Sequence, residues 1–166
     1  MTPIPQSFSL PQRVLHWTTV LLVLFNLLAS DDMEHWWRAV RHGTEPAPDL
    51  LAGANLHAYV GIAILAVAVL RLALRHIQGV PADPAVEPAP FRLLARITHF
   101  GLYALLIGMP IAGMAAYYGG IAQAGELHGE LMKTALWILI GLHVAGALVH
   151  QFYWKTNVLR RMTVGG

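Results

Sequence analysis

The sequence predicts an all-α integral membrane protein, a single four-helix bundle over residues 1–166. Hydrophobic residues make up 56% of the chain and charged residues only 12%, against about 25% charged in an average soluble domain. The apolar residues are gathered into four stretches near the roughly 20 residues that a spanning helix needs: 14–29, 50–74, 93–117 and 131–154. So few charges cannot build a water-facing surface, which excludes soluble, disordered and nucleic-acid-binding proteins.

The first helix is expected over about residues 9–30, because its apolar run is short and spans only if the helix starts early. Ser9 and Pro11 suit that start as a cap and a first-turn proline. Arg13 and the apolar run that follows also resemble a cleaved signal peptide. We favour an uncleaved helix, since cleavage would leave three spans and place one terminus outside, against the basic residues near the C-terminus.

The other three helices are expected over about residues 50–75, 92–117 and 127–154. Nine of the ten prolines lie outside the apolar stretches, and Pro110 is the exception that should kink the third helix. The connecting segments are 30–49, which is polar and acidic, 76–92, which is rich in proline, and 118–130, which contains several glycines. No internal repeat is evident.

The distribution of Lys and Arg predicts that both termini are cytoplasmic, because basic residues are retained on that side. With this orientation, three basic residues (Arg38, Arg41 and Lys133) lie outside. Eight lie inside: Arg13, Arg71, Arg75, Arg92, Arg96, Lys155, Arg160 and Arg161. Tryptophans fall near both expected interfaces, as in the aromatic belts of membrane proteins: Trp17 and Trp154 inside, Trp36 and Trp37 outside.

Histidines are the available metal ligands, because the chain has no cysteine for an iron–sulfur cluster, a thiolate zinc site or covalently attached haem. Ionisable side chains within membrane helices are costly and usually face a partner or a cofactor. Three of the nine histidines, His35, His42 and His76, fall in loops or at a helix end. Six fall in or at the start of the expected helices: His16, His57, His99, His128, His143 and His150.

Haem b suits these histidines better than zinc does. A zinc site would normally recruit a carboxylate or thiolate, whereas the only nearby acidic residues, Glu126 and Glu130, lie at one end of the fourth helix. Haem b needs only neutral imidazoles and an apolar pocket between helices. Glycines in the helices leave room for a flat ring, although close helix packing explains them equally well.

Depth in the membrane suggests how the histidines pair. His143 and His150 are only about 10 Å apart along a helix, too close for two stacked porphyrins, whereas His128 and His143 are about 22 Å apart. This spacing favours His57 with His128 in the outer half and His16 with His143 in the inner half. Fifteen residues advance about 60° beyond whole turns, so a wound or bulged segment is expected near His128. His150 is the substitute for His128 as a ligand.

The chain resembles the bacterial di-haem cytochrome b561 family, whose four-helix members are related to the cytochrome b subunits of hydrogenases and formate dehydrogenases. The resemblance covers nearly the whole length. It rests on Arg13-Val14-Leu15-His16-Trp17, His57, Arg71-Leu72-Ala73-Leu74-Arg75, His99, Gly108-Met109-Pro110-Ile111-Ala112-Gly113, Gly141-Leu142-His143, His150 and Tyr153-Trp154-Lys155.

This resemblance implies two haem b groups ligated by His16, His57, His128 and His143. The family commonly separates its two fourth-helix ligands by fourteen residues, and here the separation is fifteen. Six-coordinate irons leave no open position, so the chemistry would be electron transfer. Arg13, Arg71 and Arg75 could pair with haem propionates or serve as positive-inside anchors, and the two roles are compatible.

The resemblance further implies a bacterial inner membrane location, a quinone as one electron partner, and an oxidoreductase activity that takes an electron from superoxide and reduces ubiquinone. A basic outer entrance would attract superoxide. The expected outer face is instead largely acidic: Asp31, Asp32, Glu34, Glu45, Asp49, Glu126 and Glu130.

Two alternatives remain open. The first is an electron relay between a partner dehydrogenase, or another redox protein, and quinone. The second is a haem-free bundle whose histidines bind a divalent metal. His99 could contact quinone, although an ordinary interhelical hydrogen bond is the favoured interpretation. A homo-oligomer is compatible with the sequence.

Overall fold

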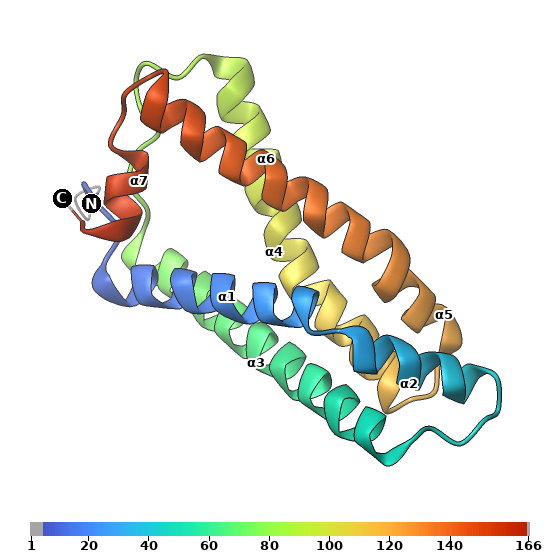
Figure 1. Ribbon diagram of the computed structural model, residues 1–166. Coiled ribbons are helices and arrows are strands. Elements are labelled where there is room, and N and C mark those ends of the chain that lie inside the picture. The colour runs from blue at the N-terminus through green and yellow to red at the C-terminus, as the bar shows by residue number, and fades with distance from the viewer. Residues whose placement is uncertain (1–4, 166) are drawn as a thin grey trace.

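The computed structural model describes residues 5–165, and every regular element in that range is helical (Figure 1). Three helical runs are long and apolar enough to cross a membrane: α3 (Pro48–Gln78), α4 (Ala89–Tyr117) and Ala122–Phe152. A fourth candidate span is α1 (Leu10–Leu28) taken together with α2 (Asp31–Arg41), which is bent by 51° from it. The chain is therefore a multi-pass membrane protein with three, or up to four, candidate spans in the described residues.

The start of α1 confirms the predicted cap. The backbone N–H of Gln12 donates to the Ser9 hydroxyl (3.3 Å), and the backbone N–H of Ser9 donates to the Gln12 side chain (3.0 Å). This reciprocal capping box satisfies two backbone donors that the first turn leaves free. Pro11 lies in the same turn, where its missing N–H removes no helical hydrogen bond.

The segment 30–49, expected as a connection, contains the helix α2. Its charges suit the helix dipole: Asp31, Asp32 and Glu34 lie in the first turn, and Arg38 and Arg41 lie in the last. A window long enough to detect a span averages over these charges and the tryptophans beside them. The hydropathy pattern therefore does not predict this short amphipathic helix.

The proline-rich segment lies between α3 and α4, as expected. Helix α3 ends at Gln78 and is followed by Gly79, whose φ of 73° lies in the left-handed region that glycine adopts readily. Pro88 caps α4, and a second proline occupies the first turn. Helix α4 continues through Pro110, which is buried.

The fourth helical run begins at Ala122, earlier than predicted, and contains a π-helical turn. It consists of α5 (Ala122–Glu126), the π-helix η1 (Leu127–Met132) and α6 (Lys133–Phe152). A π turn inserts one residue into an α-helix. The bulge expected near His128 is thus confirmed, and fifteen residues cover the rotation that fourteen would cover in a regular helix. A short helix, α7 (Val158–Thr163), follows.

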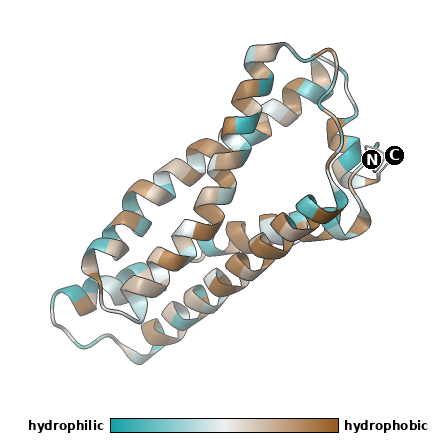
Figure 2. Cartoon of the chain, turned by 180° about the vertical axis from the view of Figure 1, so that it is seen from behind, coloured by the Kyte–Doolittle hydropathy of each residue, from teal (hydrophilic) through white to brown (hydrophobic). Residues whose placement is uncertain are grey.

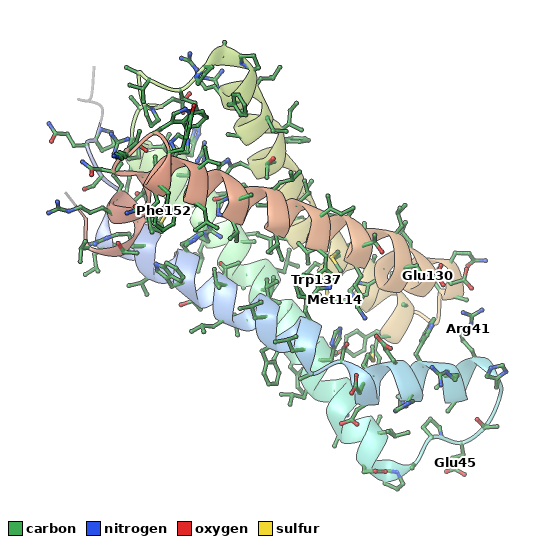
Figure 3. All side chains as sticks on the ribbon, turned by 45° about the horizontal axis from the view of Figure 1, so that its top comes forward. Arg41, Glu45, Met114, Glu130, Trp137 and Phe152 are labelled. Atoms are coloured by element: carbon green, nitrogen blue, oxygen red, sulfur yellow. The ribbon has the colours of Figure 1, made fainter. Side chains whose placement is uncertain are left out.

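The long helices pack in series, α1 on α3, α3 on α4 and α4 on α6 (Figure 1). Hydrophobic residues run along them, and hydrophilic residues concentrate at the two ends (Figure 2). Figure 3 labels Arg41 and Glu45 at the α2 end and Phe152 near the opposite, α7 end. The first and last described segments meet at the α7 end, where the Arg13 guanidinium donates to the Thr163 carbonyl (2.8 Å). Both ends of the described chain therefore lie at the same end of the bundle.

Candidate cofactor sites

Two apolar cavities lie one above the other within the bundle. The α2 cavity, lined in part by Met33 and Trp37 of α2, contains about 1130 Å³ of space. The α7 cavity, lined in part by Met162 of α7, contains about 1260 Å³. Both volumes include space that is open to the surroundings, and both cavities lie between helices, where helical bundles hold flat cofactors.

A small apolar cluster separates the two cavities. Val23 from α1, Leu106 from α4 and Leu136 from α6 line both of them. All three side chains are buried, and they belong to the main hydrophobic core cluster. The core of the bundle is thus a wall between two cavities.

One histidine pair faces the α2 cavity. His57 comes from α3 and His128 from η1, and their ring centroids are 6.1 Å apart. The Nδ1 atom of His128 donates to the Met109 carbonyl (2.8 Å). A neutral imidazole with its proton on Nδ1 has a free lone pair on Nε2, which is the state that binds a metal.

Glycine keeps the space beside His128 open. A Cβ atom on Gly113 would lie 3.2 Å from Cε1 and 3.3 Å from Nδ1 of that imidazole, closer than most carbon contacts in proteins. A side chain at this position would therefore push the ring. The sequence pointed to glycines as room for a flat ring, and the structure identifies Gly113 as the one that abuts a candidate ligand.

Helix α2 covers the end of the α2 cavity. Glu34 accepts a hydrogen bond from Lys133 (2.5 Å), and Arg41 pairs with Glu126 (2.8 Å). The Lys133 ammonium holds the pKa of Glu34 below its usual range. Trp37 fills the space against Gly125, where any Cβ atom would overlap the indole. These contacts attach α2 to the fourth helical run.

A second histidine pair faces the α7 cavity. His16 comes from α1 and His143 from α6, and their ring centroids are also 6.1 Å apart. A third imidazole is present, because His99 from α4 lies 5.1 Å from His143. The Nδ1 atom of His99 donates to the Ala95 carbonyl of its own helix (2.6 Å). The sequence indicated that His99 lies near this level but not that it shares a cavity with the pair.

Two of the three predicted arginines line the α7 cavity. Arg71 donates to Nδ1 of His16 (3.0 Å) and lies over the Tyr103 ring at 5.4 Å, and Arg75 lies nearby in the same cavity wall. Arg13 is not among the residues that line either cavity. Its guanidinium holds the end of α7 instead.

His150, the substitute ligand, lies outside both cavity walls. Its Nδ1 atom is 2.9 Å from the Thr156 hydroxyl, and its Nε2 atom is 3.5 Å from a buried carboxylate oxygen of Glu87. Both ring nitrogens therefore have protein partners. This arrangement favours His128 over His150 as the partner of His57.

The two pairs suit bis-imidazole binding of a flat metal cofactor. A first-row metal binds an imidazole nitrogen at about 2 Å, so two such bonds end to end place the nitrogens about 4 Å apart and the ring centres somewhat further. The observed 6.1 Å in both pairs agrees with this. Across residues 5–165, no group of three or more His, Asp or Glu side chains is placed to hold a bare metal ion.

A membrane helical bundle with two imidazole pairs at different depths is typical of the membrane cytochromes b. The model of the prokaryotic cytochrome b561 family matches residues 7–165. The chain belongs to this family of haem-containing electron-transfer proteins, and the earlier resemblance is confirmed.

Named relatives agree with the family. A cytochrome b562 of Cereibacter sphaeroides is 36% identical over 151 residues, which cover 91% of each chain. A protein named probable superoxide oxidase CybB from Yersinia pestis is 26% identical, covering 95% of this chain and 96% of that one. Cytochrome b561 homolog 1 of Escherichia coli is 25% identical, covering 93% and 96%.

Proposed function

We propose that the protein carries electrons across the bacterial inner membrane through two haem b groups, one in each cavity. The proposal rests on one observation: two pairs of histidines have the same 6.1 Å ring separation, and each pair lies in its own apolar cavity. The proposed ligands are His57 with His128 and His16 with His143. A haem held by two imidazoles would supply electron transfer, because its iron would have no position left for a substrate.

The remaining cavity residues have proposed supporting roles. Arg71 and Arg75 supply positive charge to the α7 cavity, where haem carboxylates could accept hydrogen bonds from them. Arg13 supports the same end indirectly by holding α7 over the cavity. In the proposed orientation, with both termini cytoplasmic and four spans, the α2 cavity is the outer one and the α7 cavity the inner one.

We propose superoxide as the outer electron donor and ubiquinone as the acceptor. Two superoxide anions would each release one electron and become O₂, and the two electrons with two protons would convert one quinone to quinol. Lys133, a cation in the wall of the outer cavity, and the name of the Yersinia pestis relative support this donor. The acidic carboxylates around α2 count against it, because they repel an anion.

Stopped-flow mixing with superoxide tests the donor. Haem reduction faster than spontaneous dismutation, followed by reoxidation by ubiquinone, is the expected result. Lys133→Gln should slow reduction, and the slowing should fade at high salt because the attraction is electrostatic. Reduction no faster than dismutation would reject superoxide and leave the electron-transfer assignment in place.

A relay from a protein donor is the second candidate. The charges at the outer end favour it. Lys133 is paired with Glu34 and Arg41 with Glu126, so the remaining charge there is mainly acidic. Such a surface suits a basic redox protein. Haem reduction that requires a co-purifying partner, and is absent with superoxide alone, would select this candidate.

A further inference from the structure

His57 differs from His128 in having no hydrogen-bond partner for its Nδ1 atom. Among the described residues, three buried side-chain polar atoms lack a partner, and two of them are Nδ1 of His57 and Oδ1 of Asn26. Both side chains line the α2 cavity. A buried donor or acceptor without a partner is unfavourable, so two such groups in one cavity require an explanation.

Asn26 is already attached to His57. Its Nδ2 atom donates to the His57 carbonyl (3.2 Å), a hydrogen bond that joins α1 to α3. Because a carbonyl only accepts, this contact assigns Nδ2 and Oδ1 of the amide. The unpaired oxygen therefore belongs to a side chain held against the same residue whose ring nitrogen is unpaired. Gly61, one turn along α3, places no side chain between them.

The two unpaired groups are chemically complementary. An imidazole that offers Nε2 to a metal keeps its proton on Nδ1, and a second partner normally accepts that proton in a hydrogen bond and fixes the ring. For His128 this partner is the Met109 carbonyl. Glu34, an acceptor in the same cavity wall, is engaged by Lys133. The Asn26 oxygen is left without a partner.

We propose that Asn26 is a positioning residue whose Oδ1 atom accepts the Nδ1–H of His57 when the α2 cavity holds its haem. One hydrogen bond would then satisfy both of the unpaired atoms, Asn26 Oδ1 and His57 Nδ1. It also makes the imidazole a stronger electron donor to the metal, which stabilises the oxidised state. The inference rests on the proposed function only in taking His57 as a ligand.

The test uses purified protein with both haems bound, as wild type, Asn26→Leu and Asn26→Ser. The matched control is Thr19→Val, which removes a buried hydroxyl from α1 that bonds to the Leu15 carbonyl and lines the other cavity. Redox titration gives both reduction potentials, and pulsed electron paramagnetic resonance reports the remote nitrogens of the ligand imidazoles. His57→Ala identifies which signals belong to the α2-end haem.

We expect Asn26→Leu to raise the potential of the α2-end haem, to change one remote-nitrogen signal and to leave the other haem unaltered. Asn26→Ser should give a smaller change, and Thr19→Val should leave the α2-end haem as it is. Unchanged potential and spectra in Asn26→Leu overturn the proposal. If that variant loses the haem, Asn26→Ser decides by the same two readouts.

Failure of the wider proposal would look different. If His57→Ala retained two haems, the ligand assignment itself would be wrong. If the wild type failed to react with superoxide or quinone, the potentials and the nitrogen signals would still report on Asn26.

Discussion

The two histidine pairs share a ring separation of 6.1 Å but differ in what holds their rings. At the α2 end, His128 donates from Nδ1 to a backbone carbonyl, which leaves Nε2 free for a metal. At the α7 end, Arg71 donates to Nδ1 of His16, so the proton of the neutral ring is on Nε2. The first ring is in the metal-binding tautomer, whereas the second must exchange its Arg71 contact before Nε2 can bind. The two pairs therefore have the same ring separation, but only His128 already has the tautomer that binds a metal through Nε2.

Removing one proposed haem ligand from each histidine pair should have the largest effect on haem content. His128→Ala and His143→Ala should each reduce the haem content from two per protein to one, because each change removes one of the two imidazoles of a pair. Pyridine haemochrome assays against protein concentration measure this. His150→Ala is the control and should retain two haems. If His128→Ala also retained two haems, His128 would not be the partner of His57.

Changing the length of the π turn should affect the α2-end pair alone. An alanine inserted after Gly129 adds a second extra residue and turns His128 by about 100° away from His57, so the α2-end haem should be lost. Deletion of Gly129 restores the spacing of a regular helix, and both haems should remain. Loss of a haem on deletion would show that the π turn is needed for more than the alignment of the two ligands.

Gly113→Ala should weaken the α2-end site without abolishing it. The new Cβ atom would lie 3.2 Å from the His128 ring, so the ring must shift by a few tenths of an ångström. We expect partial loss of one haem during dialysis, greater in Gly113→Leu. Gly141→Ala is the matched control, because its Cβ atom would meet nothing within 4 Å.

Arg71→Leu should lower the reduction potential of the α7-end haem only. A nearby positive charge favours the reduced state, so its removal should cost roughly 60 mV, a tenfold change in the electron equilibrium. Arg71→Lys should retain most of the wild-type potential. A shift of equal size at both haems in a redox titration would contradict the placement of Arg71 beside one pair.

The smallest effect should come from Glu34 on the α2 cover. Its lowered pKa means that the pair with Lys133 stabilises the fold above the usual range of a glutamate and is lost as pH falls through the lowered value. The contribution should stay under about 1 kcal/mol, because both side chains are partly exposed. Thermal unfolding from pH 7 to 3 should show this acid-dependent loss, and Glu34→Gln should lack it.

Sequence patterns predicted the features that depend on local spacing. Ser9 marks the start of α1, and residue counts along the fourth helix bring His57 to His128 and His16 to His143 while requiring a local adjustment near Gly129. The cap and the local adjustment follow from helix geometry, and the pairing follows from helix geometry together with the expected depth of each histidine in the membrane. That these four histidines bind haem stays a prediction.

Features that depend on packing between distant segments could not be predicted from the sequence. The third imidazole of the α7 cavity depends on how α4 turns His99 toward α6, and the use of Arg13 depends on where α7 lies. Helix α2 was missed because five charged residues in eleven conceal an amphipathic helix that packs against α3. No periodicity in one segment reports such contacts.

The wall formed by Val23, Leu106 and Leu136 has a consequence for the energy-storing membrane around it. Electrons tunnel through closely packed hydrocarbon over short distances, whereas a proton needs a file of water or exchangeable groups. Three aliphatic side chains between the cavities supply no such file. With the two proposed haems in place, the wall would let electrons pass between the cavities and would give protons no route between them.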